Sequence, residues 1–578
     1  MSLRKPGATF PFVLLLLFVL NVVLVFPVFF PNLSDMNMWD ESIYIQSGKQ
    51  LVTEGILPIY AWNPLVALLY VPSYFLVRAS PYWLIHSSTI GRFIVFGLLW
   101  LSSYLVAKEI SHLSPPPVTA AILLVSPVLT SLLRNPSDAL FAAMSAFGFW
   151  QVLAFYRTRK VEHLGIASVF VALAALSRND GLILCLLFVP LGVLLSVPVK
   201  RVRLSLAACI VPFVMVVGGY VLLYGASTGS FTLGTARRTY VAFEQGQGAA
   251  YWDLYSNTTR SPFVEGRTEA RRLFGTPEEN NYSVITAIRR NPRAFLKRVV
   301  QIAKRVPGQM RSIYGEGLGL IFFLLAARGV IELAARRLYL LLCVMLLWPA
   351  HLFAYFLTFF RHQYFLLPYF VVFSLTSVGL TSMLSNVESR RERYLWAIAL
   401  LGCALLGIVV DEPFVFQASL VCMLSLWIIW MIMNRYRTIE VAKPMGCILA
   451  LCVALAMRES YPAPTLRTLG VAPDEKAALF MRDHLEPGAR VGAFAPGNVW
   501  IANMNHVDIS GIRSMPSEEE FAAWMRERNL KAIYVDKALR DYEPETWALI
   551  KQQIGKSLEV AFTSDNGEVH VLRVTTPR

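Results

Sequence analysis

Long apolar runs recur along this chain, and they restrict its fold more than any other feature of the sequence. Of its 578 residues, 56% are hydrophobic and only 16% are charged. A helix needs about 18 to 20 mostly apolar residues to cross a bilayer, and several runs reach that length. We therefore expect an α-helical polytopic membrane protein with about 13 transmembrane helices. The expected spans are residues 10–30, 88–108, 117–134, 137–156, 163–177, 181–199, 204–224, 317–335, 338–358, 364–384, 394–411, 413–433 and 444–458.

Basic residues indicate how these spans are oriented, because short cytoplasmic loops are enriched in lysine and arginine. With a cytoplasmic N-terminus, the inner loops with clustered basic residues are 157–160, 200–203, 336–337, 390–393 and 435–437. Segment 61–77 is apolar enough to suggest a further span, but it carries Asn63, Pro64 and Pro72. A span there would invert every basic loop, so we expect this segment to lie at the membrane interface.

This orientation leaves two large loops outside a membrane domain that covers residues 1–460. The first comprises residues 31–87. The second, residues 225–316, carries 14 Lys/Arg against 7 Asp/Glu. Within the second loop, residues 282–310 show the pattern of an amphipathic helix, interrupted at two prolines. Those prolines are Pro292 and Pro307.

The tail, residues 461–578, differs in composition, with 14 Lys/Arg against 16 Asp/Glu. Helical patterns alternate in it with short strand-like runs, which predicts a small extramembrane α/β domain. Ser517 followed by Glu520 has the spacing of a capping box. The expected helices are 474–484, 517–529 and 545–554, and the expected strands are 490–494, 531–535, 558–563 and 569–574.

Charge and cysteine content exclude some other classes of protein. The formal charge of +15 fits a membrane protein with basic flanks, and no nucleic-acid partner is expected. The seven cysteines lie in apolar runs without a CxxC pair, so neither a zinc site nor a disulfide framework is predicted. The tail contains neither GxGxxG nor GxxxxGK[ST], so we find no nucleotide-binding motif in it.

Ionisable residues recur at the predicted outer ends of the spans, where they are costly to leave unpaired. A carboxylate there can remove the proton of an acceptor hydroxyl, and arginine can hold a departing phosphate. This chemistry suits transfer of a sugar from a polyprenyl-phosphate donor whose tail lies among the spans. The residues are Asp40, Glu41, Asp138, Arg178, Arg361 and His362.

Several short stretches resemble motifs of the GT-C glycosyltransferases, which include protein O-mannosyltransferases, lipid A aminoarabinose transferases and bacterial Rgt-type enzymes. Asp40-Glu41-Ser42-Ile43-Tyr44 resembles the DExxY stretch of their first outer loop. In chain order, the others are Trp62-Asn63-Pro64-Leu65, Gly91-Arg92-Phe93, Ser137-Asp138-Ala139-Leu140, the turn Leu176 to Gly181, and Arg361 to Pro368. Asn63 replaces a proline of the family pattern, and two residues intrude between Arg361 and Tyr364. The resemblance covers about residues 1–385.

The resemblance implies roles for individual residues. Asp40 would be the catalytic base, Glu41 its neighbour in the acceptor or sugar site, and Asp138 would orient sugar or acceptor; these three are the expected catalytic-site residues. The donor phosphate would contact Arg178, Arg361 and His362. Other substrate contacts are expected from Tyr44, Arg92 and Tyr364. Some relatives bind a divalent metal near the first loop, for which Glu54 or His86 would be the ligands here; no metal site is predicted, and no other cofactor is expected.

The resemblance also implies partners and a location. The donor would be a polyprenyl-phosphate-linked sugar, used in a single inverting displacement, and the acceptor a lipid, a glycan or a protein. The chain would lie among the lipids of the bacterial inner membrane, with its C-terminal domain in the periplasm.

Other interpretations stay open for the same residues. A transporter or flippase of lipid-linked sugars is one alternative, although transporters tend to place ionisable groups at the bilayer midplane. A non-catalytic envelope scaffold is another. Structural explanations also exist: Asp138 could favour a helix N-terminus, Arg178 could pair with Asp180, Arg361 and His362 could anchor in the interface, and Arg92 could pair with an outer-loop acid.

Overall fold

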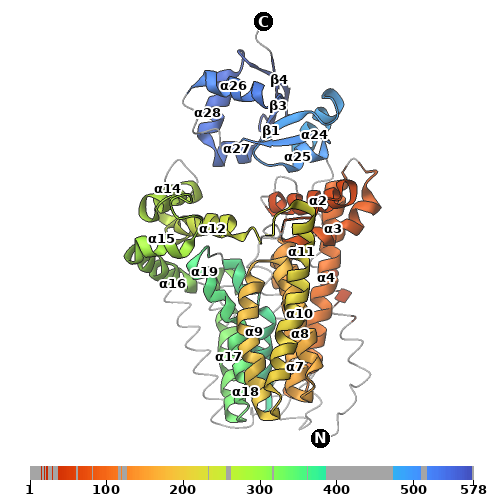
Figure 1. Ribbon diagram of the computed structural model, residues 1–578, viewed down its shortest axis with the longest axis vertical. Helices are drawn as coiled ribbons and strands as arrows, with labels where there is room; N and C mark the ends of the chain where they lie inside the picture. Colours follow the sequence, from red (N-terminus) through yellow and green to blue (C-terminus); the bar gives the residue numbers. More distant parts are fainter. Residues whose placement is uncertain are drawn as a thin grey trace, which may run out of the picture. The chain divides into compact units, whose positions relative to one another are not determined.

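The computed structural model divides the chain into two units (Figure 1). The first unit comprises Met1–Val28, Ile94–Thr232 and Ile302–Pro464, and the second comprises Phe29–Phe93, Leu233–Gln301 and Thr465–Arg578. The structure describes residues 37–59, 63–80, 82–114, 126–231, 233–255, 262–314, 318–360, 362–385, 473–509 and 517–575, with residues 15, 18, 19, 21–23, 29 and 119.

Helices dominate the part before residue 386. The expected outer loop at residues 31–87, called the first outer region below, holds α2 (Asn37–Glu54) and α3 (Pro64–Val77), and α4 (Trp83–Glu109) follows. Next come α6 (Ser126–Leu133), α7 (Pro136–Thr158), α8 (Glu162–Ser177), α9 (Asp180–Ser196), α10 (Val202–Phe213) and α11 (Gly219–Thr228). The second outer loop holds α12 (Thr235–Ala250), α13 (Trp252–Tyr255), α14 (Pro262–Phe274), α15 (Val284–Arg290) and α16 (Pro292–Tyr314). The last group is α17 (Leu318–Ala335), α18 (Tyr339–Leu347), α19 (Phe353–Leu357) and α20 (Tyr369–Ser385).

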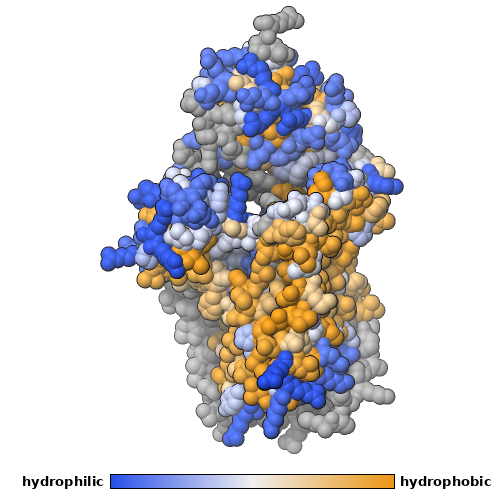
Figure 2. All heavy atoms as spheres, in the orientation of Figure 1, coloured by the Kyte–Doolittle hydropathy of each residue, from blue (hydrophilic) through white to orange (hydrophobic). Residues whose placement is uncertain are grey.

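Five helical segments among the described residues are long and apolar enough to cross a membrane. They are Trp83–Glu109, Pro136–Thr158, Asp180–Val199, Val202–Thr228 and Tyr339–Leu357. Apolar side chains cover the surface of α9 and α10 (Figure 2). The polytopic helical class is thus confirmed. The expected spans at 394–411, 413–433 and 444–458 lie outside the described residues, so the total of 13 stays a prediction.

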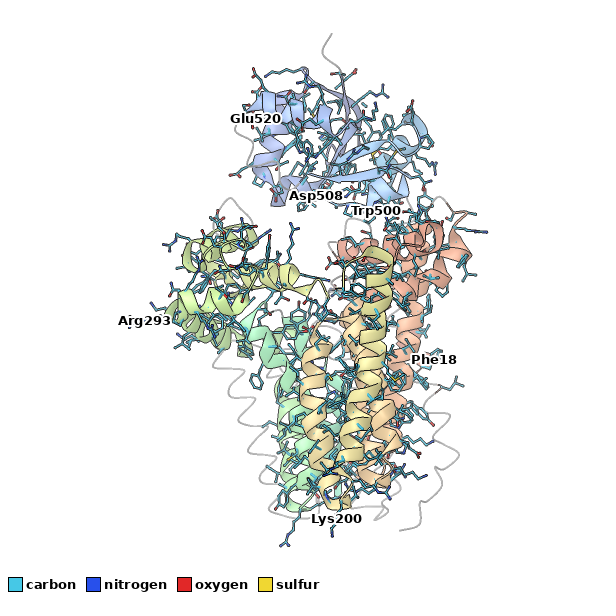
Figure 3. All side chains as sticks on the ribbon, in the orientation of Figure 1. Phe18, Lys200, Arg293, Trp500, Asp508 and Glu520 are labelled. Carbon is cyan, nitrogen blue, oxygen red and sulfur yellow. The ribbon has the colours of Figure 1, made fainter. Side chains whose placement is uncertain are left out.

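α7, α8, α9 and α10 alternate in direction, which brings the basic loops 157–160 and 200–203 to one end of the first unit (Figure 1). α7 and α8 pack together, and so do α9 and α10, joined by the short segments at 159–161 and 197–201. Lys200 marks this end in Figure 3. Arg157 there forms an ion pair with Glu109, Nε to Oε1 2.5 Å. The starts of α7 and α9 and the end of α8 therefore lie at the opposite end.

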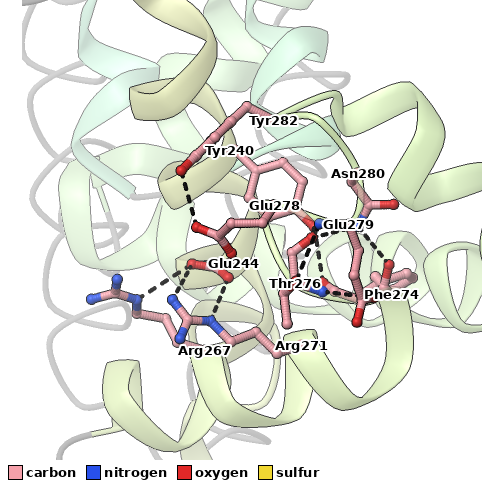
Figure 4. Close-up of polar contacts among 11 residues, drawn as sticks. Tyr240, Glu244, Arg267, Arg271, Phe274, Thr276, Glu278, Glu279, Asn280 and Tyr282 are labelled. Carbon is pink, nitrogen blue, oxygen red and sulfur yellow. Dashed lines mark hydrogen bonds and ion pairs between the residues drawn. The ribbon is translucent and has the colours of Figure 1, made fainter. Parts of the chain in front are cut away.

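The second outer loop folds into a helical cluster around aromatic side chains. Tyr240, Phe243 and Phe274 form its core. Beside them, the buried Glu244 carboxylate pairs with Arg271, Nε to Oε1 2.7 Å, and with Arg267 (Figure 4). The charged residues of this loop are thus partly used in its own folding.

The two prolines of this loop differ in effect. Pro292 occupies the first turn of α16, where a missing N–H has no partner to lose, so the expected interruption there is confirmed. The expected break at Pro307 is wrong, because α16 continues to Tyr314. A proline inside a helix removes one hydrogen bond, and the remaining turns of this amphipathic helix hold their geometry around it.

The C-terminal domain is a five-stranded sheet with helices on both faces. Its strands are β1 (Arg490–Ala493), β2 (Asn505–Asp508), β3 (Leu530–Val535), β4 (Leu558–Thr563) and β5 (His570–Val574), in the order β2-β1-β3-β5-β4. β1 pairs in parallel with β2 and β3, whereas β5 is antiparallel to β3 and β4. Its helices are α24 (Pro473–His484), α25 (Gly497–Ile501), α26 (Glu518–Glu527), α27 (Lys537–Tyr542) and α28 (Pro544–Gln553).

Alternation along β3 explains how this sheet acquires two cores, because successive side chains of a strand point to opposite faces. Ile533 and Val535 pack with α26 and α28 on one face. Ala532 and Tyr534 pack with α24 and α25 on the other. The expected helices and four expected strands are confirmed; β2, a polar strand at the edge, is an addition.

Asp536 makes the stability of this domain dependent on pH. Its carboxylate accepts a hydrogen bond from the Leu539 amide at 2.7 Å, which caps α27. Burial raises the pKa of Asp536 from 3.8 to about 6. The folded state therefore holds this proton more tightly than the unfolded state, so the stabilisation is complete below about pH 4 and is lost as the pH rises through about 6.

We expect amides of β3 and α27 to exchange more slowly at pH 5 than at pH 7, after correction for intrinsic rates. Asp536→Asn, which keeps an acceptor for the cap, should show a smaller pH difference. Hydrogen–deuterium exchange of the full chain measures both. An equal pH difference in the two proteins would contradict this assignment.

Candidate functional site

One candidate cluster lies in the second unit and is built around Glu41 on α2. Arg92 of α4 donates from Nη2 to Glu41 Oε2 at 2.6 Å, and the two side chains are 3% and 1% exposed. Ser88 and Tyr70 donate hydroxyl hydrogen bonds to Glu41 Oε1 at 2.5 and 2.7 Å. A buried charge needs such partners. The structural alternative for Arg92, an ion pair with an acid of the first loop, is thus present as the Arg92–Glu41 pair.

Gly91 makes room for this arrangement. A Cβ at Gly91 would lie 2.2 Å from a ring carbon of Tyr70, so a larger residue would displace the ring that bonds Glu41. Tyr44 is also buried and accepts a hydrogen bond from the Asn63 side chain at 2.9 Å. Together these contacts attach α2 to α3 and α4.

Asp40 differs from its neighbour in environment. It lies in the first turn of α2 and is exposed, about 100° around the helix from the buried Glu41. Within the described part of the chain, no hydrogen bond or ion pair engages its carboxylate. The helix is therefore held by Glu41 while Asp40 stays available for a ligand.

A separate candidate cluster lies in the first unit, at the end of the bundle opposite Lys200. Arg178 follows α8 and donates from Nε to Asp180 Oδ2 at 2.8 Å. Its Nη1 donates to Asp138, which is buried at the start of α7. Gly181 allows the tight turn from α8 to α9, because a Cβ at this position would lie 2.3 Å from the Ala175 backbone nitrogen. Two carboxylates thus hold one guanidinium.

Three further side chains complete this cluster. Tyr364 lies beneath Arg178, whose guanidinium carbon is 4.9 Å from the ring centroid, and it stacks on Tyr355 with centroids 4.2 Å apart. The Tyr355 hydroxyl bonds Asp180 and accepts from Arg178 Nη2 at 3.3 Å. Gln363 donates to Asp138 Oδ2 at 3.0 Å.

Sequence reasoning identified Asp138, Arg178 and Tyr364 but missed Tyr355. Gln363 and Asp180 stood in the motifs without an assigned role. Tyr355 sits inside an apolar run, and only its place near a predicted outer end could have drawn attention to it.

Two of the groups expected to contact the donor phosphate, Arg361 and the side chain of His362, lie outside the described residues. Glu54 and His86 are both exposed, and no group of three or more His, Cys, Asp or Glu residues within the described ranges could hold a metal ion. We assign no step to a metal.

The fold is shared with solved membrane-protein structures. ArnT from Cupriavidus metallidurans in the apo state matches with a TM-score of 0.57 and 13% identity, covering 98% of each chain. The structure of the same protein bound to undecaprenyl phosphate matches with a TM-score of 0.53 and 13% identity, covering 96% of this chain and 97% of that one.

An archaeal structure matches as well. The Archaeoglobus fulgidus oligosaccharyltransferase in the apo form matches with a TM-score of 0.51 and 12% identity, covering 97% of this chain and 74% of that one. No protein-family model and no curated protein matches the sequence. The fold expected from the resemblance to GT-C glycosyltransferases is thereby confirmed.

Proposed function

We propose that this protein is a membrane glycosyltransferase that moves a sugar from a polyprenyl-phosphate donor to an acceptor hydroxyl. The observation that carries this proposal is the exposed Asp40 carboxylate on a helix that the buried Glu41–Arg92 pair holds in place. The fold shared with ArnT, solved with undecaprenyl phosphate, supports a donor of the same chemical class.

The reaction is a single displacement. The acceptor oxygen attacks the anomeric carbon and forms the new glycosidic bond while the bond from that carbon to the phosphate oxygen breaks. The phosphate leaves with the bonding electron pair, and Asp40 takes the proton of the acceptor hydroxyl. Attack opposite the leaving group inverts the anomeric carbon. Glu41 and Tyr44 position α2, and Arg92 acts through Glu41.

The donor phosphate is assigned to Arg178, Arg361 and His362. Asp138 and Asp180 both pair with the guanidinium of Arg178. A phosphate would replace one of these carboxylates as its partner, which leaves Asp138 free to contact sugar or acceptor hydroxyls. Tyr364 would keep the guanidinium in its plane.

The membrane arrangement is part of the proposal. Residues 1–460 would form about 13 spans with the N-terminus in the cytoplasm, and residues 461–578 would lie in the periplasm. The basic residues at one end of the bundle and the Asp138–Arg178 cluster at the other support this orientation. The protein would then lie in the bacterial inner membrane and act on a lipid, a glycan or a protein at its outer face.

Transfer in reconstituted membranes tests this function. Radiolabelled polyprenyl-phosphate sugars are supplied one at a time, with total envelope extract as acceptor. Label that moves to an acceptor only when the protein is present supports the proposal and identifies the sugar. Label that crosses the bilayer without a new covalent bond would instead favour a flippase.

Arg178→Ala is expected to weaken donor binding by about 10- to 100-fold, because a charge-assisted hydrogen bond to phosphate contributes about 1.5–3 kcal/mol. The donor affinity of Arg178→Lys should lie between those of the wild type and Arg178→Ala, since lysine keeps the charge but loses the planar guanidinium fork. Equilibrium binding of the polyprenyl-phosphate sugar measures the effect. Arg159→Ala, at the basic end of the same bundle, is the control. Unchanged affinity in Arg178→Ala would move the phosphate elsewhere.

A further inference from the structure

The second unit contains an open pocket that shares no residue with the proposed catalytic groups. Its volume is about 430 Å³. The C-terminal end of α2, the turn between α3 and α4, and two segments of the C-terminal domain line it, and α2 contacts α25 beside it. The lining residues used below are Lys49, Arg78, Ser80, Trp83, Arg482 and Asn503.

Cationic side chains dominate the charge of this pocket. Lys49, Arg78 and Arg482 line it, and none of its described lining residues is a carboxylate. Lys49 Nζ lies 4.8 Å from the centroid of the Trp83 ring, and burial lowers the pKa of this ammonium group. Arg482 also pairs with the neighbouring Asp483, Nε to Oδ1 3.1 Å. An anion placed between the three cations would be attracted to each of them.

The uncharged polar groups also suit an anion. Ser80 Oγ accepts a hydrogen bond from the Tyr82 amide at 3.1 Å, which leaves its own proton to donate. Asn503 adds an exposed side-chain amide. Together with the cations, these groups offer several donors to one small oxyanion such as phosphate.

Apolar surface adjoins the cationic residues. Phe75 and Leu76 are 53% and 76% exposed, and they lie three and two residues before Arg78 in the chain. They belong to α3, an apolar helix of 14 residues. At 1.5 Å per residue it is about 21 Å long, too short to cross a bilayer core of about 30 Å. This short apolar helix with Arg78 at its C-cap fits a place at the membrane interface.

We propose that this pocket binds the phosphate of an anionic lipid headgroup, whose acyl chains lie against the exposed residues of α3. The site is separate from the base, because Lys49 lies nine residues after Asp40, about 14 Å along α2 and on the opposite side of the helix. The lipid would hold the C-terminal domain, through Arg482, to the first outer region. The proposal does not depend on glycosyl transfer.

The test is lipid binding to the purified full chain, measured by native mass spectrometry. The probes are dioleoyl phosphatidylglycerol, dioleoyl phosphatidylcholine and inorganic pyrophosphate. We expect phosphatidylglycerol to bind more tightly than the zwitterionic lipid. Lys49→Gln/Arg78→Gln should weaken it by about 25-fold, because each cation near an anionic headgroup contributes about fivefold. Arg490→Gln/Lys537→Gln removes two exposed charges outside the pocket and should change the affinity less than twofold.

A second pair of substitutions distinguishes a lipid from a soluble anion. Phe75→Ser/Leu76→Ser should weaken the binding of phosphatidylglycerol but leave the binding of pyrophosphate unchanged. Equal binding of phosphatidylglycerol by the Lys49/Arg78 variant and the control variant overturns the site. Pyrophosphate binding as tight as lipid binding, with no effect of the apolar substitutions, overturns the lipid assignment. If the double variant does not fold, Arg482→Gln on the half-buried rim should still lose about fivefold.

Discussion

Asp40→Asn is expected to reduce sugar transfer by about 10²- to 10⁴-fold, the usual contribution of a general base. Asparagine has nearly the same shape but cannot take the proton of the acceptor hydroxyl. Because Asp40 is exposed, the substitution should leave the fold intact. Single-turnover transfer with a saturating polyprenyl-phosphate sugar is the measurement, and donor affinity should stay close to that of the wild type.

The matched control for this experiment is Glu54→Gln, which removes an exposed carboxylate at the other end of the same helix. It should transfer sugar at nearly the wild-type rate. If Asp40→Asn lost donor binding but kept turnover, Asp40 would contact the donor instead. Wild-type rates in Asp40→Asn would remove the base from this position altogether.

Arg92→Met is expected to destabilise the protein by about 3–5 kcal/mol, because it leaves the buried Glu41 carboxylate without a cation. Methionine fills a similar volume, so the effect reports the lost charge partner more than lost packing. The apparent melting temperature of the full chain in detergent, at a fixed scan rate, measures it. Transfer should fall as well, since Glu41 holds the helix that presents Asp40.

The double variant Glu41→Gln/Arg92→Met separates charge from packing. It removes both charges and keeps an acceptor for Tyr70 and Ser88, so we expect it to recover a large part of the lost stability. A double variant as unstable as Arg92→Met alone would show that packing around Arg92, not the ion pair, carries the stability. Arg201→Met, in the short segment between α9 and α10, should melt like the wild type.

The fold of the C-terminal domain was largely predictable because its signals are local. Ser517 and Glu520 predicted a helix start, and the Ser517 hydroxyl accepts a hydrogen bond from the Glu520 backbone amide at 3.2 Å. Apolar alternation predicted β3. Edge strand β2 was missed because Asn505-His506-Val507-Asp508 carries little apolar signal, and its pairing with β1 depends on residues about 15 positions away.

The candidate site was predictable only in part. The motifs pointed to Asp40, Asp138 and Arg178 individually, but not to their partners. Both Asp40 and Glu41 were expected to face the substrates, whereas the helix turns Glu41 into the core and Asp40 to the surface. Tyr355 was hidden in an apolar run, and its bond to Arg178 joins residues 177 positions apart.

The sequence by itself determined the polytopic class, the positions of most described helices and the composition of the C-terminal domain, because span length, periodicity and capping act over a few neighbouring residues. Only the tertiary structure decided which carboxylate is buried against Arg92, which tyrosine supports Arg178, and that Pro307 lies within a continuous helix. Those outcomes depend on contacts such as Gln363 with Asp138, 225 positions apart. Their free energy comes from burial and charge pairing that no local pattern records.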